Sequence, residues 1–264
     1  MKIEMNEINE RINACFVYID GMDRELKNLI KNSFLEIVIG KRAVEQSEED
    51  EEEEKIDMLK DATRYIYQKT LPNHRVGIVG ELLFHTFMRI PELSEKFLST
   101  YPTIGHTDAY KEFYKGFDGI YYCDGMVWIA EVKGKVKTKD LNNDNKLKIK
   151  IASKQLEKEV NDTEINRWQR AKMLLSNQLG ENDNDKIVRK IFRKNQKNNY
   201  NQIISTLLIY DKEEFDIENI KEYAEKLYHS QVKKQKILLL CIRSYDYNEI
   251  IKYIKEEMCE EYEF

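Results

Sequence analysis

Charged residues near the middle of the chain have the types and spacing that could hold a metal ion between two carboxylates, with a lysine beside it. Asp118 lies in Gly-Phe-Asp-Gly and precedes the run Val-Trp-Ile-Ala-Glu-Val-Lys, which ends in Glu131, Val132 and Lys133. On a strand, Glu131 and Lys133 share one face, and Val132 turns the opposite way into apolar packing. Two carboxylates in a mostly apolar sheet repel each other, and a divalent cation relieves that cost. We therefore expect Asp118 and Glu131 to bind Mg²⁺, with the carbonyl of Val132 as a further ligand.

Such an ion would serve phosphodiester hydrolysis, because it lowers the pKa of bound water and stabilises developing charge. Lys133 would orient the attacking water or stabilise the transition state. The pattern acid-x-Lys is weak by itself, since it also occurs at 25–27, 53–55 and 144–146. At 131–133 an apolar strand carries it, and Asp118 precedes it across a tight turn. An ion pair between Glu131 and Lys133 is the alternative.

A fourth charged residue, Glu81, lies in the strongly apolar segment 76–88. An acid in such a helix should be paired, protonated or metal-bound. We expect Glu81 to support the metal site and the catalysis, and a buried salt bridge to Arg75 or Arg89 is the alternative. One turn further along, His85 is expected to be a hydrogen-bonded core residue rather than a ligand.

Basic residues gather after this motif, although the whole chain carries a net charge of −5. Between residues 133 and 197, Lys and Arg outnumber Asp and Glu roughly two to one. Such a local excess suits a phosphate-binding surface, and a charge-rich solvated face is the alternative. The residues expected to contact nucleic acid are Lys135, Lys137, Lys154, Gln155 and Lys158, with Gln155 at the scissile phosphate; Lys148, Arg167 and Trp168 belong to the same basic stretch.

The elements that must position these residues follow from hydrophobic periodicity. Strands are predicted at 14–19, 116–123, 126–133, 202–210 and 237–243, with a hairpin turn at Asp124-Gly125. Helices are predicted at 22–40, 57–69, 76–88, 92–99, 151–160, 164–179, 217–231 and 248–257, with another from near 186. The lysine-rich, polar stretch 134–150 is expected to lead into the helix at 151–160. Strands that alternate with helices indicate an α/β fold with a mixed sheet covered by helices.

Composition limits the class of protein. With 264 residues, 34% charged and 11% aromatic, the chain suits a folded globular protein. No long linker divides it, so we expect one domain: an N-terminal elaboration (1–70), a catalytic core (71–160) and further helices and core strands (161–264). Four scattered cysteines without a C-x-x-C pair argue against a zinc site and a disulfide framework. Without a signal-peptide pattern or a membrane-spanning run, we expect a cytoplasmic protein with no membrane partner.

The order and spacing of Glu81, Asp118 and Glu131-Val132-Lys133 resemble the PD-(D/E)xK nuclease superfamily. Phe117 replaces the proline of that pattern, a common variation that leaves the aspartate in place. The resemblance implies a restriction-endonuclease-like fold, in which helices flank a central mixed sheet. It also implies hydrolysis of phosphodiesters with Mg²⁺, for which Mn²⁺ can substitute.

A narrower similarity covers residues 75–158 most clearly. The segments Val79–Leu83, Lys115–Gly119 and Ala130–Lys133 are similar to HamA, the nuclease family of the Hachiman anti-phage defence system. That similarity implies DNA as substrate and a partner helicase, HamB, which holds the nuclease inactive until aberrant or damaged DNA is sensed. Released nuclease would then degrade DNA indiscriminately, as in abortive infection. A stand-alone restriction-like or repair endonuclease and a catalytically inactive nucleic-acid-binding module are the alternatives.

Overall fold

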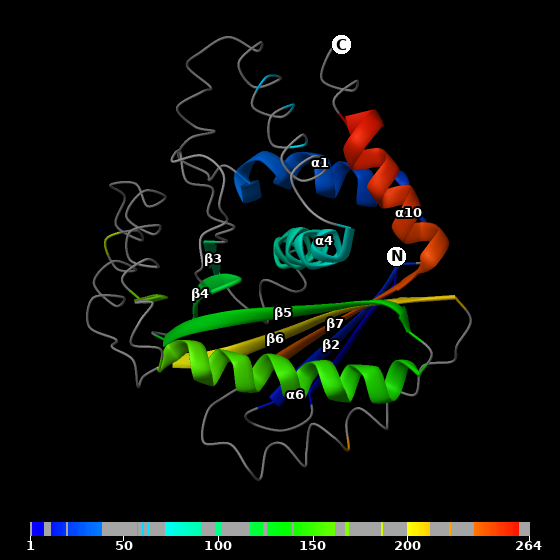
Figure 1. Cartoon of the computed structure of the whole chain (residues 1–264). Helices are drawn as coiled ribbons and strands as arrows, with labels where there is room; N and C mark the ends of the chain where they lie inside the picture. Colours follow the sequence, from blue (N-terminus) through cyan, green and yellow to red (C-terminus); the bar gives the residue numbers. More distant parts are fainter. Residues whose placement is uncertain are drawn as a thin grey trace.

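One mixed sheet organises the described part of the chain (Figure 1). The structure is a computed structural model that describes residues 2–7, 12–19, 21–38, 57, 60, 63, 72–90, 99–101, 117–123, 126–138, 140–161, 167–168, 186, 200–211, 222 and 235–258. Its strands are β1 (Lys2–Glu7), β2 (Ile12–Ile19), β3 (Ser99–Tyr101), β4 (Gly119–Cys123), β5 (Met126–Thr138), β6 (Tyr200–Tyr210) and β7 (Gln235–Arg243). Their order in the sheet is β1-β2-β7-β6-β5-β4-β3.

The centre of the sheet is parallel and its edges are antiparallel. Strands β2, β7, β6 and β5 run in the same direction, whereas β1 pairs antiparallel with β2, and β4 with both β3 and β5. Side chains of β6 and of β7 from Ile237 to Ile242 are buried without alternation. Parallel strands that are covered on both faces have this near-continuous apolar character, so helices must lie on each side.

Those helices form two layers. On one face lie α4 (Pro72–Phe87), α1 (Arg24–Val38) and α10 (Ser244–Lys252), which continues as the π-helical turn η1 (Tyr253–Glu257); α6 (Leu141–Val160) lies on the other face (Figure 1). Both α4 and α6 contact β5 and β6, so these two strands lie between helices. Within the described residues, no helix is long and apolar enough to cross a membrane.

The predicted fold class is confirmed: a mixed sheet is flanked by helices, and β1 and β2 attach the N-terminal elaboration to one edge of that sheet. All five predicted strands and the hairpin of β4 with β5 are present. The sequence interpretation missed β1, whose polar composition is compatible with an edge strand because only one of its sides is paired.

The predicted strand end at 133 and the predicted helix start at 151 are wrong. Strand β5 continues to Thr138, and α6 begins at Leu141, ten residues before the predicted start. Asp140 caps this helix by accepting a hydrogen bond from the backbone N of Asn143 at 3.0 Å. Buried polar residues hide the helical pattern: Asn145, for example, is fully buried and accepts a 2.7 Å hydrogen bond from Thr206 of β6.

Other predicted boundaries differ less. The last helix begins at Ser244 rather than 248, and Ser99, the predicted end of a helix, begins β3. Most of the helices predicted at 57–69, 92–99, 164–179 and 217–231 lies outside the described residues, as does the Asp124-Gly125 turn. The residues that are described within or near these segments, apart from Ser99, are helical: Asp57, Lys60, Thr63, Arg167, Trp168, Lys186 and Glu222.

Candidate active site

The candidate site lies where β4 separates from β5. The first residue of β4, Gly119, pairs with Ala130, and beyond this point β5 continues along β6 to Thr138. From Glu131 onwards, β6 is therefore the only neighbour of β5 among the described strands. An edge of this kind presents backbone groups that can bind something other than a strand.

Asp118 occupies part of this open edge. Its Oδ2 accepts a hydrogen bond from the backbone N of Val132 at 2.7 Å, in place of a strand partner. Within a strand, the N–H and C=O of one residue point to the same side, so the Val132 carbonyl faces the same open edge. The backbone oxygen that we expect to serve as a metal ligand therefore lies beside the Asp118 carboxylate.

Side chains alternate across β5 as predicted. Val132 is buried toward α4, where a Cβ added at Gly80 would lie 3.5 Å from its Cγ1. Lys135, on the opposite face, pairs with Asp144 of α6 at 2.5 Å. Glu131 and Lys133 share that face, and Lys133 Nζ donates to Glu131 Oε1. The ion pair that was the alternative for these two residues is thus present.

Four carboxylates and two cations interact electrostatically here; we call them the carboxylate cluster, and its members are Glu81, Asp118, Glu131, Glu159, Lys133 and Arg167. Burial raises the pKa of Asp118 to about 6. Burial and the charge of Asp118 raise the pKa of Glu131 well above its usual range. Burial lowers the pKa of Lys133, but Glu131 and Asp118 more than reverse this and raise it overall.

The carboxylate cluster has a surplus of negative charge. When all six groups are ionised, four negative charges and two positive charges leave a net charge of −2, which one divalent cation would balance. Glu131 is 1% exposed, and its Oε2 has no hydrogen-bond partner among the described residues. A buried, unpartnered carboxylate oxygen is costly, and a cation or a proton bound there would offset that cost.

The residues present fit a magnesium ion. No group of three or more His, Cys, Asp or Glu side chains within the described residues has the arrangement of a complete metal site. Magnesium does not require one, because it commonly takes one or two carboxylates and completes its shell with waters and phosphate oxygens. Asp118, Glu131 and the Val132 carbonyl offer oxygen donors of that kind at one edge.

Glu81 reaches this site from α4 and is partly exposed. Burial, followed by the charges of Asp118 and Glu131, raises its pKa well above the usual range, and Lys133 acts in the opposite direction. Of its two suggested salt-bridge partners, Arg89 pairs instead with Glu36 at 3.3 Å. The side chain of Arg75 lies outside the described residues. Asp118, Glu131 and Lys133 therefore set the electrostatic environment of Glu81, as expected for a residue of the candidate site.

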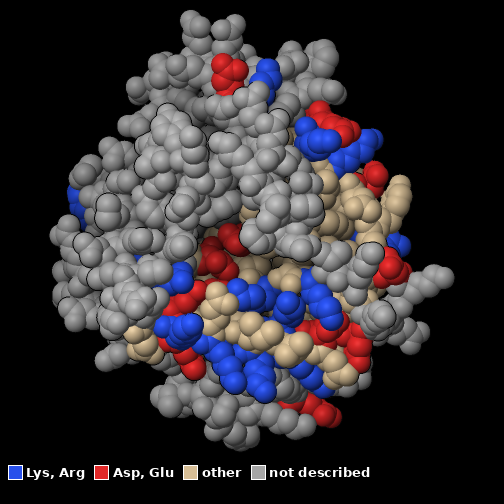
Figure 2. All heavy atoms as spheres, in the orientation of Figure 1, with Lys and Arg blue, Asp and Glu red and all other residues tan. Residues whose placement is uncertain are grey.

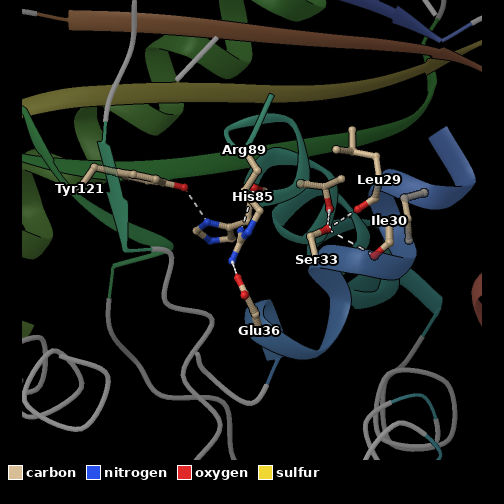
Figure 3. A network of polar contacts seen from close by, with 8 residues as sticks. Leu29, Ile30, Ser33, Glu36, His85, Arg89 and Tyr121 are labelled. Carbon is tan, nitrogen blue, oxygen red and sulfur yellow. Dashed lines mark hydrogen bonds and ion pairs between the residues drawn. The ribbon is translucent and has the colours of Figure 1, made fainter. Parts of the chain in front are cut away.

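His85 anchors the backbone at Asp118, in what we call the histidine network: His85, Tyr121, Arg89 and Glu36 (Figure 3). His85 Nε2 lies 2.8 Å from the carbonyl oxygen of Asp118, and Nδ1 lies 2.6 Å from the Tyr121 hydroxyl. A carbonyl only accepts, so Nε2 carries the hydrogen. Burial and the charge of Arg89 lower the pKa of His85 to about 3, so the ring is neutral and Nδ1 accepts from Tyr121.

Both ring nitrogens of His85 thus bind protein groups, and the interpretation of this residue as a hydrogen-bonded core residue is confirmed. Gly119 completes the fit. A Cβ there would lie 2.9 Å from His85 Cε1 and 2.9 Å from Tyr121 Cε2, closer than carbon atoms approach. A glycine directly after Asp118 is therefore required by packing.

A basic surface follows β5 and α6 (Figure 2). Lys and Arg side chains gather over these two elements, and acidic side chains lie in the hollow beside them. Burial and the charges of Lys135 and Lys133 lower the pKa of Lys148 on α6. Three lysines therefore lie close enough to repel one another, which favours a polyanion at this end of the site.

The residues expected to contact nucleic acid are not all in one place. Lys135 lies next to the candidate site, whereas the exposed Lys154 and Lys158 lie one turn apart on α6, about 100° and about 60° around the helix from Gln155. Gln155 donates to Glu159 at 2.9 Å. The backbone of Lys137 is part of β5, and its side chain lies outside the described residues.

Sequence reasoning missed Glu159 and gave Lys148 and Arg167 no contact of their own. Gln155 and Glu159 are four residues apart, and this spacing places them on one face of a helix. That signal was available from the sequence. The predicted helix 151–160 contained both residues, but nothing in the sequence indicated that this face lies against Glu131.

A mixed sheet with helices on both faces, and an aspartate beside a Glu-Val-Lys strand at the end of a hairpin, are features of the restriction-endonuclease-like class. The family model of HamA matches residues 3–258. The chain therefore belongs to the HamA family. No curated protein and no solved structure showed a significant match to the chain.

Proposed function

We propose that this protein is a magnesium-dependent nuclease that hydrolyses phosphodiester bonds in DNA. The observation that carries the proposal is the open edge of β5, where Asp118, Glu131 and Lys133 meet. The surplus charge of the carboxylate cluster and the unpartnered Oε2 of Glu131 support a divalent cation at this edge. Mn²⁺ is expected to substitute, because the donors are oxygens throughout.

The roles of the residues follow from their places. Asp118 and Glu131 would hold the ion, the Val132 carbonyl faces the same edge, and Glu81 adds negative charge from α4. When bound, the ion would lower the pKa of a water and polarise the phosphodiester. Lys133 is 22% exposed beside Glu131, so its ammonium can donate to the attacking water or to a phosphate oxygen.

A plasmid-degradation assay tests this proposal. The wild-type protein, Glu131→Ala and Lys133→Ala are compared in Mg²⁺ and in EDTA, and folding of each variant is checked by circular dichroism. We expect cleavage by the wild type in Mg²⁺ only, and a loss of about a thousandfold in either variant. Equal cleavage by all three proteins would contradict the assignment of these residues.

Membership of the HamA family supports a role as the effector of a Hachiman-type anti-phage defence system. A helicase of the HamB type would then restrain the nuclease until aberrant DNA is sensed. A gene for a superfamily-2-like helicase beside this one would favour this role over a stand-alone restriction-like or repair endonuclease. Without that partner, overexpression is expected to harm cells, and Glu131→Ala to relieve the harm; equal toxicity of the two proteins would contradict a nuclease effector.

A catalytically inactive nucleic-acid-binding module is the second candidate. The Lys133–Glu131 ion pair favours it, because a lysine that neutralises Glu131 can replace a cation. This candidate predicts binding of DNA without cleavage in Mg²⁺ or Mn²⁺, even when the partner helicase and damaged DNA are added. Cleavage under any of those conditions that requires Glu131 would exclude it.

A further inference from the structure

A second pair of oppositely charged side chains borders the candidate active site. Arg167 Nη2 lies 3.0 Å from Glu159 Oε1, and the Arg167 and Glu159 side chains are only 14% and 8% exposed. The same oxygen accepts the 2.9 Å hydrogen bond from Gln155 Nε2. One carboxylate oxygen therefore holds two different donors, an amide and a guanidinium, at the end of α6.

Aromatic packing places this pair next to Asp118. Trp168 follows Arg167 and packs edge-on against Phe117, with ring centroids 5.5 Å apart. Trp168 also packs against Tyr200 at the start of β6, with ring centroids 6.1 Å apart. Phe117 directly precedes Asp118, and all three aromatic residues are buried. Residues 167–168 are thus packed against the segment that carries the aspartate.

The electrostatics agree with this placement. The charge of Arg167 acts on Asp118, and that of Glu159 acts on Asp118, Glu131 and Lys133. Glu159 Oε2 is buried and has no hydrogen-bond partner among the described residues. A buried ion pair is costly to form and adds little net stability, so its place beside a candidate catalytic site requires another explanation.

We propose that Arg167 binds a nucleic-acid phosphate at the candidate active site, and that Glu159 is the positioning residue that holds Arg167 and Gln155 toward that phosphate. This proposal rests on the proposed function for the substrate class, and it adds a cation on the side of the carboxylates opposite Lys135 and Lys148. A guanidinium has five N–H donors, so Arg167 can contact Glu159 and a phosphate together. The nucleic-acid backbone then passes from Arg167, across Glu131 and Lys133, to Lys135 and Lys148.

The test measures DNA binding separately from cleavage. A fluorescein-labelled 20-mer, single-stranded and as a duplex, is titrated with the full-length protein in EDTA at several salt concentrations. For Arg167→Ala we expect about tenfold weaker binding and a salt slope that is smaller by about 0.7 to 0.9, the loss of one phosphate contact. Arg167→Lys keeps the charge and should keep the slope. For Glu159→Gln we expect weaker binding with the slope retained, since Arg167 is still present but less well held.

Arg243→Ala is the matched control. Arg243 also forms an ion pair with a buried acid, Asp246, at 2.7 Å. Arg243 lies at the end of β7 and pairs with Tyr210 of β6. Ile204, the β6 residue that pairs with Glu131, is six residues away from Tyr210 along the same strand. At about 3.3 Å per residue this is about 20 Å from the candidate site. We expect Arg243→Ala to leave DNA binding and its salt slope unchanged.

Several outcomes would overturn the proposal. If Arg167→Ala lowers the melting temperature but keeps the wild-type affinity and slope, the pair only ties residues 167–168 to α6. If Glu159→Gln binds DNA more tightly, Glu159 competes with phosphate instead of positioning its donors. Cleavage in Mg²⁺ separates the two proposals. If DNA binding depends on Arg167 but the protein cleaves no DNA, only the proposed nuclease activity is contradicted. If the wild type cleaves DNA and Arg167→Ala binds it as tightly as the wild type, only the proposed role of Arg167 is contradicted.

Discussion

Two polar groups, each with buried members, lie side by side at Asp118, and they differ in how many of their donors and acceptors have hydrogen-bond partners. In the histidine network, both nitrogens of His85 and the guanidinium of Arg89 bind protein partners. In the carboxylate cluster, one oxygen of Glu131 and one of Glu159 have no hydrogen-bond partner among the described residues, and four carboxylates face two cations.

This difference indicates a structural role for the histidine network and a functional role for the carboxylate cluster beside it. A satisfied network fixes the backbone that carries a functional residue, and it needs nothing from outside. A cluster with surplus charge and unpartnered oxygens is stabilised only when a ligand or a proton arrives. Substitutions in the two groups should therefore change stability in opposite directions, and three measurements test this.

The largest effect is expected for His85→Ala. The substitution leaves a cavity in the core and removes the partners of the Tyr121 hydroxyl and the Asp118 carbonyl. We expect the free energy of unfolding to fall by about 3 kcal/mol. Urea denaturation in EDTA measures it, and a loss below about 1 kcal/mol would show that the histidine network does not hold this region.

The pH dependence of stability should be altered by the same residue. The pKa of His85 is about 3 when folded, below its unfolded value, so the unfolded chain binds more protons. Its contribution to stability is complete above about pH 6.5 and is lost as the pH falls toward 3. Between pH 6 and 4, this amounts to about 1.4 kcal/mol per pH unit.

We therefore expect the stability of the wild-type protein to fall more steeply with acid than that of His85→Gln, measured by urea denaturation in EDTA. The carboxylate cluster is present in both proteins, so the difference between their slopes isolates the histidine. Parallel pH profiles would contradict a neutral, buried imidazole.

The smallest effect, and the one of opposite sign, is expected for Glu81→Gln. The pKa of Glu81 is raised by burial and by two neighbouring carboxylates, so the folded state favours the protonated form. Stability from this group is then present at low pH and lost as the pH rises. Without metal at pH 8, Glu81→Gln should gain about 1 kcal/mol, and the gain should shrink toward pH 5.

The matched control for this substitution is Glu36→Gln, which removes a carboxylate that pairs with Arg89 in the histidine network. It should lower stability at pH 8. Thermal melting in EDTA and in Mg²⁺ compares the two variants, and Mg²⁺ should stabilise the wild type more than Glu81→Gln. If both variants lose stability, the ionised carboxylate of Glu81 stabilises the fold, and the expected repulsion among the carboxylates is contradicted.

Local pattern was sufficient for the parts of the site that lie within one hairpin. Period-two alternation placed Glu131 and Lys133 on one face and Val132 on the other, and the Asp-Gly turn predicted the pairing that brings Asp118 close. The helix around Glu81 was also predictable, because its residues are almost all apolar and such a segment favours a buried helix. These features depend on residues that are near one another in the sequence.

The sequence by itself thus determined the fold class, the hairpin and three acids of the candidate site, Glu81, Asp118 and Glu131. Only the tertiary structure decided that β5 extends past β4, so that the backbone of Val132 meets the carboxylate of Asp118 at an open edge. It also decided that Glu159 and Arg167 join this site from α6 and the segment beyond it. The physical reason is that periodicity tells which face a side chain occupies, whereas packing between distant elements decides what that face meets.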